Sequence, residues 1–257
     1  MNSGLLEFET ASGSHPGKAR ALNEDNYFAA PEQGVWLIAD GMGGHSNGKL
    51  ASSVVVETAK TVGRSASAPD LLARFKDRIY RANSELIRLS QQDGGKVIGS
   101  TVAALLVFAG HFACVWSGDS RVYLLRSGSI TQISHDHSEV QEMIDGGLLD
   151  PAEARHWPRR NVVTQAVGVF EEPKLDSVQG KIEAGDIFVL CSDGLTGHVE
   201  DQEILALAGG RPPQEACEAL IQLTLDRGAK DNVTVIVVAC RPADEDGPAV
   251  SPAAKVT

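Results

Sequence analysis

Residues 233–239 read Val-Thr-Val-Ile-Val-Val-Ala, and this run limits the choice of fold more than any other stretch of the chain. β-branched side chains favour strands. A strand that is apolar at nearly every position is buried on both faces and lies inside a sheet. The chain therefore needs further layers of structure on each side of this strand.

Shorter β-type runs and two blocks of helical periodicity supply the remaining elements. Residues 101–134 contain the turn signals Ala109-Gly110, Gly118-Asp119 and Ser127-Gly128, and the spacing predicts a meander of antiparallel strands. Paired helices between blocks of strands predict an α+β domain with helices outside two packed sheets. Strands are expected at 5–11, 26–30, 34–39, 177–181 and 186–190, and helices at 48–62, 69–91, 201–207 and 213–227.

Composition narrows the class of protein. The 257 residues are 42% hydrophobic, enough for one large core, and a single domain is predicted over 1–241. A polar segment at about 135–160 is expected to form a flap, and the Pro-, Ala- and acid-rich tail 242–257 to be disordered. The net charge of −11, without a basic stripe, argues against a nucleic-acid partner.

Location and oligomeric state follow by default from the same sequence. The cysteines at 114, 191, 217 and 240 show no CxxC spacing and predict buried, reduced thiols. Residues 1–10 do not resemble a signal peptide, and no apolar run approaches the ~20 residues that span a bilayer. A cytoplasmic monomer without membrane contact is therefore expected.

Acidic residues recur at turns and strand ends. Asp40 follows the apolar run 35–39 and precedes Gly41, and Asp193 follows 187–191 and precedes Gly194. Asp119 lies in a turn, and Asp231 comes directly before the strand at 233. One such aspartate is usually a turn or cap residue. Several at strand ends, without histidine or cysteine beside them, favour hard divalent cations over zinc.

Six motifs in order carry a resemblance to a known family. The chain resembles the bacterial metal-dependent serine/threonine protein phosphatases of type 2C over about residues 8–239. The resemblance implies a four-layer α/β/β/α sandwich of two antiparallel sheets flanked by helix pairs, with a flap insertion. The motifs are Arg20-x-x-Asn23-Glu24-Asp25, Asp40-Gly41-Met42-Gly43-Gly44-His45, Gly99-Ser100-Thr101, Gly118-Asp119-Ser120-Arg121, Ser192-Asp193-Gly194-Leu195 and Asp231-Asn232.

The resemblance also implies a role for each site residue. Asp40 is expected to bridge two magnesium or manganese ions, with Asp193 and Asp231 as further ligands of the first ion and Glu24 and the Gly41 carbonyl as further ligands of the second. Asp119, with Asp193, is expected to bind a third and weaker ion. Arg20 is expected to grip the substrate phosphate, since its planar fork matches two phosphate oxygens. Asp25, His45 and Asn232 are expected to support the site from outside the ligand set.

The implied reaction is hydrolysis of phosphoserine and phosphothreonine in proteins by metal-activated water. This reaction would oppose a serine/threonine kinase. A phosphorylated protein, the target of a cognate kinase, is the expected partner. Two alternatives stay open. A pseudophosphatase would bind phosphoproteins without turnover but would lack metal carboxylates, all of which are present. A metal-dependent phosphoesterase acting on small molecules has the same carboxylates.

Three smaller signals remain. Met42 occupies a position where many eukaryotic relatives have histidine, so the group that protonates the leaving alkoxide is not identified; His45 is interpreted as structural. His135-Asp136-His137-Ser138 is interpreted as a loop at the start of the flap rather than a metal site. The flap arginines, Arg155, Arg159 and Arg160, either pair with nearby acids or contact the substrate.

Overall fold

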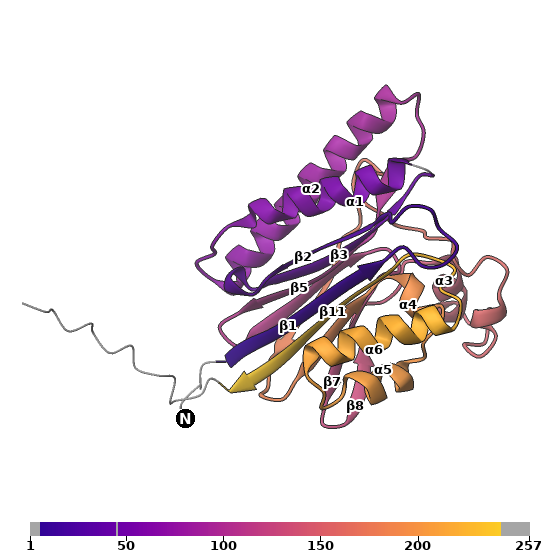
Figure 1. Ribbon diagram of the computed structural model, residues 1–257. Coiled ribbons are helices and arrows are strands. Elements are labelled where there is room, and N and C mark those ends of the chain that lie inside the picture. Colours follow the sequence, from indigo (N-terminus) through magenta and orange to yellow (C-terminus); the bar gives the residue numbers. More distant parts are fainter. Residues whose placement is uncertain (1–5, 45, 243–257) are drawn as a thin grey trace, which may run out of the picture.

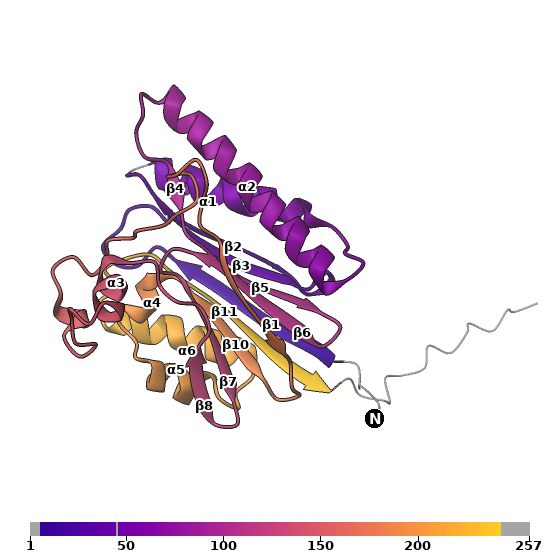
Figure 2. The ribbon, with the colours of Figure 1, turned by 180° about the vertical axis from the view of Figure 1, so that it is seen from behind.

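Two antiparallel sheets packed face to face form the centre of the computed structural model, which describes residues 6–44 and 46–242. One sheet has five strands in the order β1-β11-β10-β7-β8, and the other has the order β2-β3-β5-β6-β9 with β4 paired to β3. Helices α1 and α2 cover one outer face, and α5 and α6 cover the other (Figures 1 and 2). The predicted four-layer sandwich is confirmed.

The bounds of the elements agree with most of the predicted segments. The helices are α1 (Ser46–Ala59), α2 (Ala68–Gln92), α3 (Glu139–Asp145), α4 (Asp193–Thr196), α5 (Asp201–Ala208) and α6 (Pro213–Asp226), with 3-10 turns at Pro31–Gln33, Lys60–Val62 and Ala154–His156. The strands are β1 (Leu6–His15), β2 (Asp25–Ala30), β3 (Val35–Met42), β4 (Gly99–Ser100), β5 (Val102–Phe108), β6 (His111–Ser117), β7 (Arg121–Arg126), β8 (Ser129–Gln132), β9 (Asp176–Lys181), β10 (Ile187–Cys191) and β11 (Val233–Pro242).

Alternation along the strands builds three separate hydrophobic layers. In β11, Val235 and Val237 face α6, whereas Ile236 and Val238 face the opposite sheet. In β3, Leu37 faces the α1–α2 pair, while Trp36 and Ile38 lie between the sheets. Because successive side chains point to opposite faces, a strand that is apolar throughout suits the interior of a four-layer fold.

The predicted meander over residues 101–134 is wrong in one respect. Strands β5 and β6 pair in one sheet and β7 and β8 in the other, so the chain crosses between the sheets after Ser117. The crossing is made by Gly118, whose φ is +113° and whose Cβ would lie 2.6 Å from Thr101 Cγ2. Local turn signals do not distinguish a hairpin from a crossing, because both need glycine at such a position. Asp119 therefore lies in the connection from β6 of one sheet to β7 of the other, and not in a hairpin.

Strand β1 is longer than predicted, since it continues from Ala11 to His15. The polar residues Ser12 to His15 show no apolar alternation, yet they pair with β11 along the whole register. Gly13 allows this extension, because a Cβ there would lie 2.7 Å from Ile221 Cδ1 on α6. Pairing with a neighbouring strand thus extended this element beyond its sequence signal.

The layer between the sheets gives a direct test of the packing. Phe188 is fully buried there and meets Phe112 edge-on with ring centroids 5.2 Å apart. Phe188→Ala is expected to lower the free energy of unfolding by about 3–5 kcal/mol, because burial is lost and a cavity is left. The matched control is Val178→Ala on the edge strand β9, where the side chain is exposed and the expected loss is below ~1 kcal/mol. Urea unfolding of both variants measures the difference, and equal losses would contradict the layered core.

The start of β1 and the end of β11 lie at one end of the sandwich, and α3 with the surrounding flap projects from the other (Figure 1). The predicted disordered tail lies outside the described residues, apart from Pro242. Among the residues that the structure describes, no helix combines the length and apolar character that crossing a bilayer requires.

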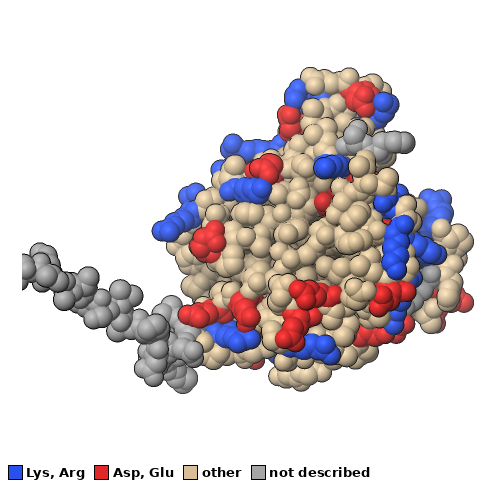
Figure 3. Space-filling model, in the orientation of Figure 1, with Lys and Arg blue, Asp and Glu red and all other residues tan. Residues whose placement is uncertain are grey.

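On the face in Figure 3, Asp and Glu side chains gather over the lower half, where β11 and α6 lie, while several Lys and Arg side chains meet at the right edge, where the flap lies. All four cysteines are free and buried, as predicted.

Candidate metal centre

Five aspartates from four separate regions converge at the flap end of the sandwich. Asp25 begins β2 and is the direct cross-strand partner of Asp40 near the end of β3. Asp193 begins α4 after β10, and Asp231 lies two residues before β11. Asp119 lies at the crossing between the sheets. The structure thus brings together the acidic residues that the sequence placed at strand ends.

Burial and mutual repulsion raise the pKa values of this cluster. Burial raises the pKa of Asp40 well above its ordinary value, and the charges of Asp25 and Asp193 add to the effect. Burial likewise raises the pKa of Asp119. The pKa of Asp25 and that of Asp193 rise to about 6, in each case chiefly through burial. Buried carboxylates this close together need a cation to remain charged.

Hydroxyl groups hold one oxygen of Asp25 and leave the other free. Ser192 Oγ and Thr234 Oγ1 both donate to Asp25 Oδ2, at 2.8 and 2.7 Å. Thr234 Oγ1 lies 2.7 Å from Ser14 Oγ, which accepts a hydrogen bond from Asn23. The second oxygen, Asp25 Oδ1, is buried and has no hydrogen-bond partner among the described residues. This oxygen is available to a ligand at the cluster.

Glycines let the backbone approach Glu24. A Cβ on Gly41 would lie 1.9 Å from the carbonyl oxygen of Gly48, and one on Gly48 would lie 2.5 Å from Glu24 Oε1. Glu24 Oε1 is buried without a hydrogen-bond partner in the described part of the chain. The residues therefore fit a hard cation, because such ions take carboxylate and carbonyl oxygens and these oxygens lack other partners.

Arg20 modifies this arrangement. Its guanidinium Nη2 donates to Asp231 Oδ2 at 2.7 Å, while about half of the arginine side chain is exposed. The hydrogen bond to Asp231 is the main cause of the raised pKa of Arg20. Within the described residues no three acidic, histidine or cysteine side chains converge tightly enough to enclose one ion. Asp231 Oδ2 is bonded to Arg20, and Asp25 Oδ2 to two hydroxyls.

Asn232 is the residue that fixes the loop carrying Arg20 and Glu24. Its side-chain amide donates to the carbonyls of Pro16 and Leu22, both at 2.9 Å, and its Oδ1 accepts from the Glu24 amide at 2.8 Å. One side chain thus makes three bonds to residues more than 200 positions away. The supporting role predicted for Asn232 stays a prediction, but these bonds are its physical basis. His45 lies outside the described residues.

Thr101 links the ends of the two sheets and was not predicted as a site residue. Its Oγ1 accepts from the Asp40 amide at 3.0 Å and lies 2.8 Å from Ser120 Oγ, beside Asp119. The backbone amide of Thr101 also donates to the Asp40 carbonyl at 2.8 Å. The only sequence signal was its place in the Gly99-Ser100-Thr101 motif.

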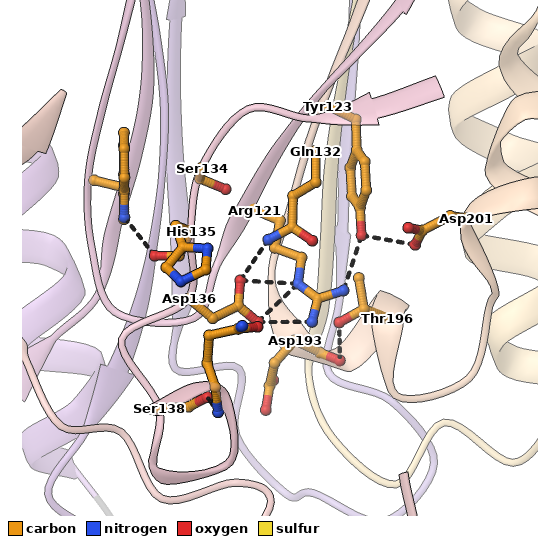
Figure 4. A network of polar contacts seen from close by, with 12 residues as sticks. Arg121, Tyr123, Gln132, Ser134, His135, Asp136, Ser138, Asp193, Thr196 and Asp201 are labelled. Atoms are coloured by element: carbon orange, nitrogen blue, oxygen red, sulfur yellow. Dashed lines mark hydrogen bonds and ion pairs between the residues drawn. The ribbon is translucent and has the colours of Figure 1, made fainter. Parts of the chain in front are cut away.

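The segment after β8 is a structural loop, as interpreted. Asp136, His137 and Ser138 are buried, and Asp136 pairs with Arg121 (Figure 4). In the flap, Arg159 pairs with Glu139 at 2.7 Å. Of the two roles considered for the flap arginines, this one is pairing with a nearby acid. The side chain of Arg155 lies outside the described set.

Cys191 is fully buried with a pKa raised to about 12, so this thiol is unsuited to act as a nucleophile.

The raised pKa values predict an unusual pH dependence of the metal-free protein. In the unfolded chain Asp25 has its ordinary pKa of 3.8, and in the folded protein about 6, so the folded state holds the proton more tightly. The stabilisation is complete below pH 4 and is lost as the pH rises through about 6. In EDTA, wild type is expected to lose about 2 kcal/mol more stability between pH 4.5 and 7.5 than Asp25→Asn does. Denaturant unfolding at the two pH values measures this difference, and an equal pH dependence in the two proteins would contradict it.

Comparison with known proteins identifies related chains. The family model described as protein phosphatase 2C matches residues 13–231. Serine/threonine protein phosphatase PstP of Mycobacterium tuberculosis is 36% identical over 234 residues, which are 90% of this chain and 45% of PstP. A putative protein phosphatase 2C-type protein of Streptococcus pyogenes is 32% identical over 86% of this chain and 93% of its own length. This chain thus spans less than half of PstP but nearly all of the streptococcal relative.

Solved structures resemble this one closely. PppA, described as a key regulatory component of T6SS in Pseudomonas aeruginosa, has 38% identity and a TM-score of 0.85, over 91% of this chain and 98% of that one. The catalytic domain of PstP in complex with two manganese ions has 34% identity and a TM-score of 0.83, over 92% of this chain and all of that one.

Proposed function

This chain belongs to the protein phosphatase 2C family, and on that premise we propose that it hydrolyses phosphoserine and phosphothreonine in proteins. The observation that carries the proposal is the cluster of buried and half-buried acidic residues, in which Glu24 Oε1 and Asp25 Oδ1 lack hydrogen-bond partners among the described residues. A related domain with two manganese ions supports a two-ion magnesium or manganese centre here.

The ligand set that we propose follows the arrangement of the cluster. The negative charges of Asp25, Asp193 and Asp119 all act on Asp40 and raise its pKa. This central place in the cluster suits a carboxylate shared by two ions. Glu24 and the Gly41 carbonyl would complete one ion's ligands, and Asp193 and Asp231 the other's. Asp119, which is electrostatically coupled to Asp193, would hold the third and weaker ion with it. Bound ions supply an acidified water and positive charge against the phosphoryl oxygens.

The chain's own residues would bind the phosphate and orient the reacting water. Arg20 is exposed at the rim, so its guanidinium can leave Asp231 and donate to two phosphoryl oxygens in a planar fork. Asp25 Oδ1 can accept a hydrogen bond from a water at the cluster, while Ser192 and Thr234 hold the other carboxylate oxygen in place. Met42, half-buried at the end of β3, has a thioether that cannot donate a proton to the leaving oxygen.

The partners follow from the reaction. A protein phosphorylated on serine or threonine would be the substrate, and the corresponding kinase would act in opposition. A cytoplasmic location and a monomeric state remain predictions. The pseudophosphatase alternative is disfavoured, because the full set of carboxylates is present and converges at one end of the fold.

Phosphate release from a phosphothreonine peptide tests this proposal. Purified protein is expected to release phosphate with manganese and not with EDTA, and to prefer the peptide over free phosphorylated metabolites. A preference for the metabolites would favour the small-molecule phosphoesterase. Failure to release phosphate from either class with manganese or magnesium would favour the pseudophosphatase.

A further inference from the structure

The flap is closed at its base by a short neck, formed by Asp136–Ser138 and by residues 162–164. Ser138 and Val163 form an antiparallel bridge, and the Glu139 amide donates to the Val162 carbonyl at 2.9 Å. The Thr164 amide donates to the His137 carbonyl at 2.8 Å. The position of the neck therefore determines where the flap stands relative to the acidic cluster at the same end of the sandwich.

A half-buried arginine holds the neck. Arg121 Nε donates to both carboxylate oxygens of Asp136, at 3.0 and 2.9 Å, and Nη2 donates to Oδ2 at 2.6 Å. Gln132 Nε2 donates to Asp136 Oδ1 at 2.7 Å. The Asp136 side chain is only 7% exposed, so water can do little to solvate this carboxylate if the pair is broken. Figure 4 shows the guanidinium facing this carboxylate.

The arginine is itself held from the opposite side. Arg121 Nη1 donates to Tyr123 Oη at 3.0 Å, and Tyr123 Oη donates to Asp201 Oδ1 at 3.0 Å, at the start of α5 (Figure 4). The planar guanidinium uses its several donors in fixed directions, which an ammonium group cannot reproduce. Arg121 thus connects the neck to β7, and its hydrogen bond to Tyr123 extends the connection to α5.

A second connection joins the neck to the residue before Asp119. The His137 amide donates to the Gly118 carbonyl at 2.9 Å, and the Gly118 amide donates to His137 Nδ1 at 3.2 Å. The neck is therefore attached on both sides of Asp119, at Gly118 and at Arg121. The flap and the acidic cluster thus share the segment 118–121, which joins β6 to β7.

We propose that Arg121 is a positioning residue that holds the flap in register with the acidic cluster, and so sets the preference for phosphorylated polypeptides over small phosphate esters. A small ester needs only the cluster and Arg20, whereas a polypeptide also presents residues that must meet the flap. The flap offers Leu148, which is 77% exposed, as a contact for such residues. This inference rests on the proposed phosphatase function.

Strand β7 contains a matched control. Arg126 at its other end pairs with Asp186 through Nε at 2.8 Å and Nη2 at 2.7 Å, and the Asp186 side chain is 1% exposed. Both arginines thus belong to β7, and each pairs with a buried aspartate outside this strand. Of the two, only Arg121 contacts the neck. Loss of Arg126 reports the general effect of breaking such a pair.

The experiment compares kcat/KM for a phosphothreonine peptide and for p-nitrophenyl phosphate, with manganese, in wild type, Arg121→Lys, Arg121→Met and Arg126→Met. The ratio of the two values is expected to fall roughly tenfold in both Arg121 variants, because small misplacements of binding groups are costly. The ratio is expected to stay within about twofold of wild type in Arg126→Met. An unchanged ratio in the Arg121 variants, or an equal fall in Arg126→Met, would overturn the proposal.

A second measurement does not depend on turnover. Arg159, exposed in the flap, is a site for trypsin, and cleavage there is expected to be several-fold faster in the Arg121 variants than in Arg126→Met. If Arg121→Met does not fold, Arg121→Met/Asp136→Leu replaces the buried pair with apolar side chains and is tested in its place. Equal cleavage rates would contradict the positioning role. A wild type inactive on both substrates would refute the proposed function and the specificity claim, while cleavage would still show whether Arg121 holds the neck.

Discussion

Asp193→Asn is expected to abolish phosphate release and, at the same time, to stabilise the metal-free protein. The carboxylate is half-buried beside Asp231 and Asp40, and its pKa is raised to about 6. Removing its charge would remove a metal ligand, and the loss in kcat is expected to be roughly 10³-fold or more. It would also relieve repulsion, raising the free energy of unfolding in EDTA at pH 7.5 by on the order of 2 kcal/mol.

The two readouts of this variant separate a functional carboxylate from a structural one. Phosphate release with manganese measures the first, and denaturant unfolding in EDTA measures the second. Asp226→Asn, at the exposed end of α6, is the control and is expected to change neither. If Asp193→Asn loses stability along with activity, the residue serves the fold, and its assignment as a ligand fails.

Arg20→Met is expected to reduce kcat/KM for a phosphothreonine peptide by roughly 100-fold, because a charge-assisted, two-pronged contact to phosphate is lost. Manganese affinity is not expected to fall, since Arg20 competes for Asp231 rather than assisting it as a ligand. Titration calorimetry with manganese measures this second quantity.

Lys18→Met provides the control from the same loop. Lys18 is exposed, and its backbone amide donates to the Ala229 carbonyl whatever its side chain. The substitution removes a positive charge two residues from Arg20 and is expected to change kcat/KM less than about threefold. A parallel fall in manganese affinity and activity in Arg20→Met would mean that Arg20 only positions Asp231.

The sequence was sufficient for the layers and for the location of the acidic residues. The run 233–239 is apolar at nearly every position, which required burial on both faces, and Val235 and Ile236 indeed face different layers. Asp40 and Asp193 come directly after apolar runs, and the resemblance implied that they converge at one metal centre. These features depend on periodicity and on residues adjacent in the chain, which a sequence displays directly.

Features that depend on distant partners were not predicted. The crossing at Gly118 has the same local signal as a hairpin, and only packing against Thr101 distinguishes it. The extension of β1 to His15 depends on pairing with β11. The Arg121–Asp136 pair joins residues from a strand and a loop, and neither position carries a pattern that indicates the other.

The central claim is that Asp40, Asp193 and Asp231 together hold the ions that the reaction uses. Anomalous scattering from crystals of the protein grown with manganese tests it most directly. We expect two strong peaks at the flap end of the sandwich, both within about 2–2.5 Å of Asp40 carboxylate oxygens, with one of them also touching Asp193 and Asp231. Manganese bound away from Asp40, or no peak at this end of the fold, would contradict the account.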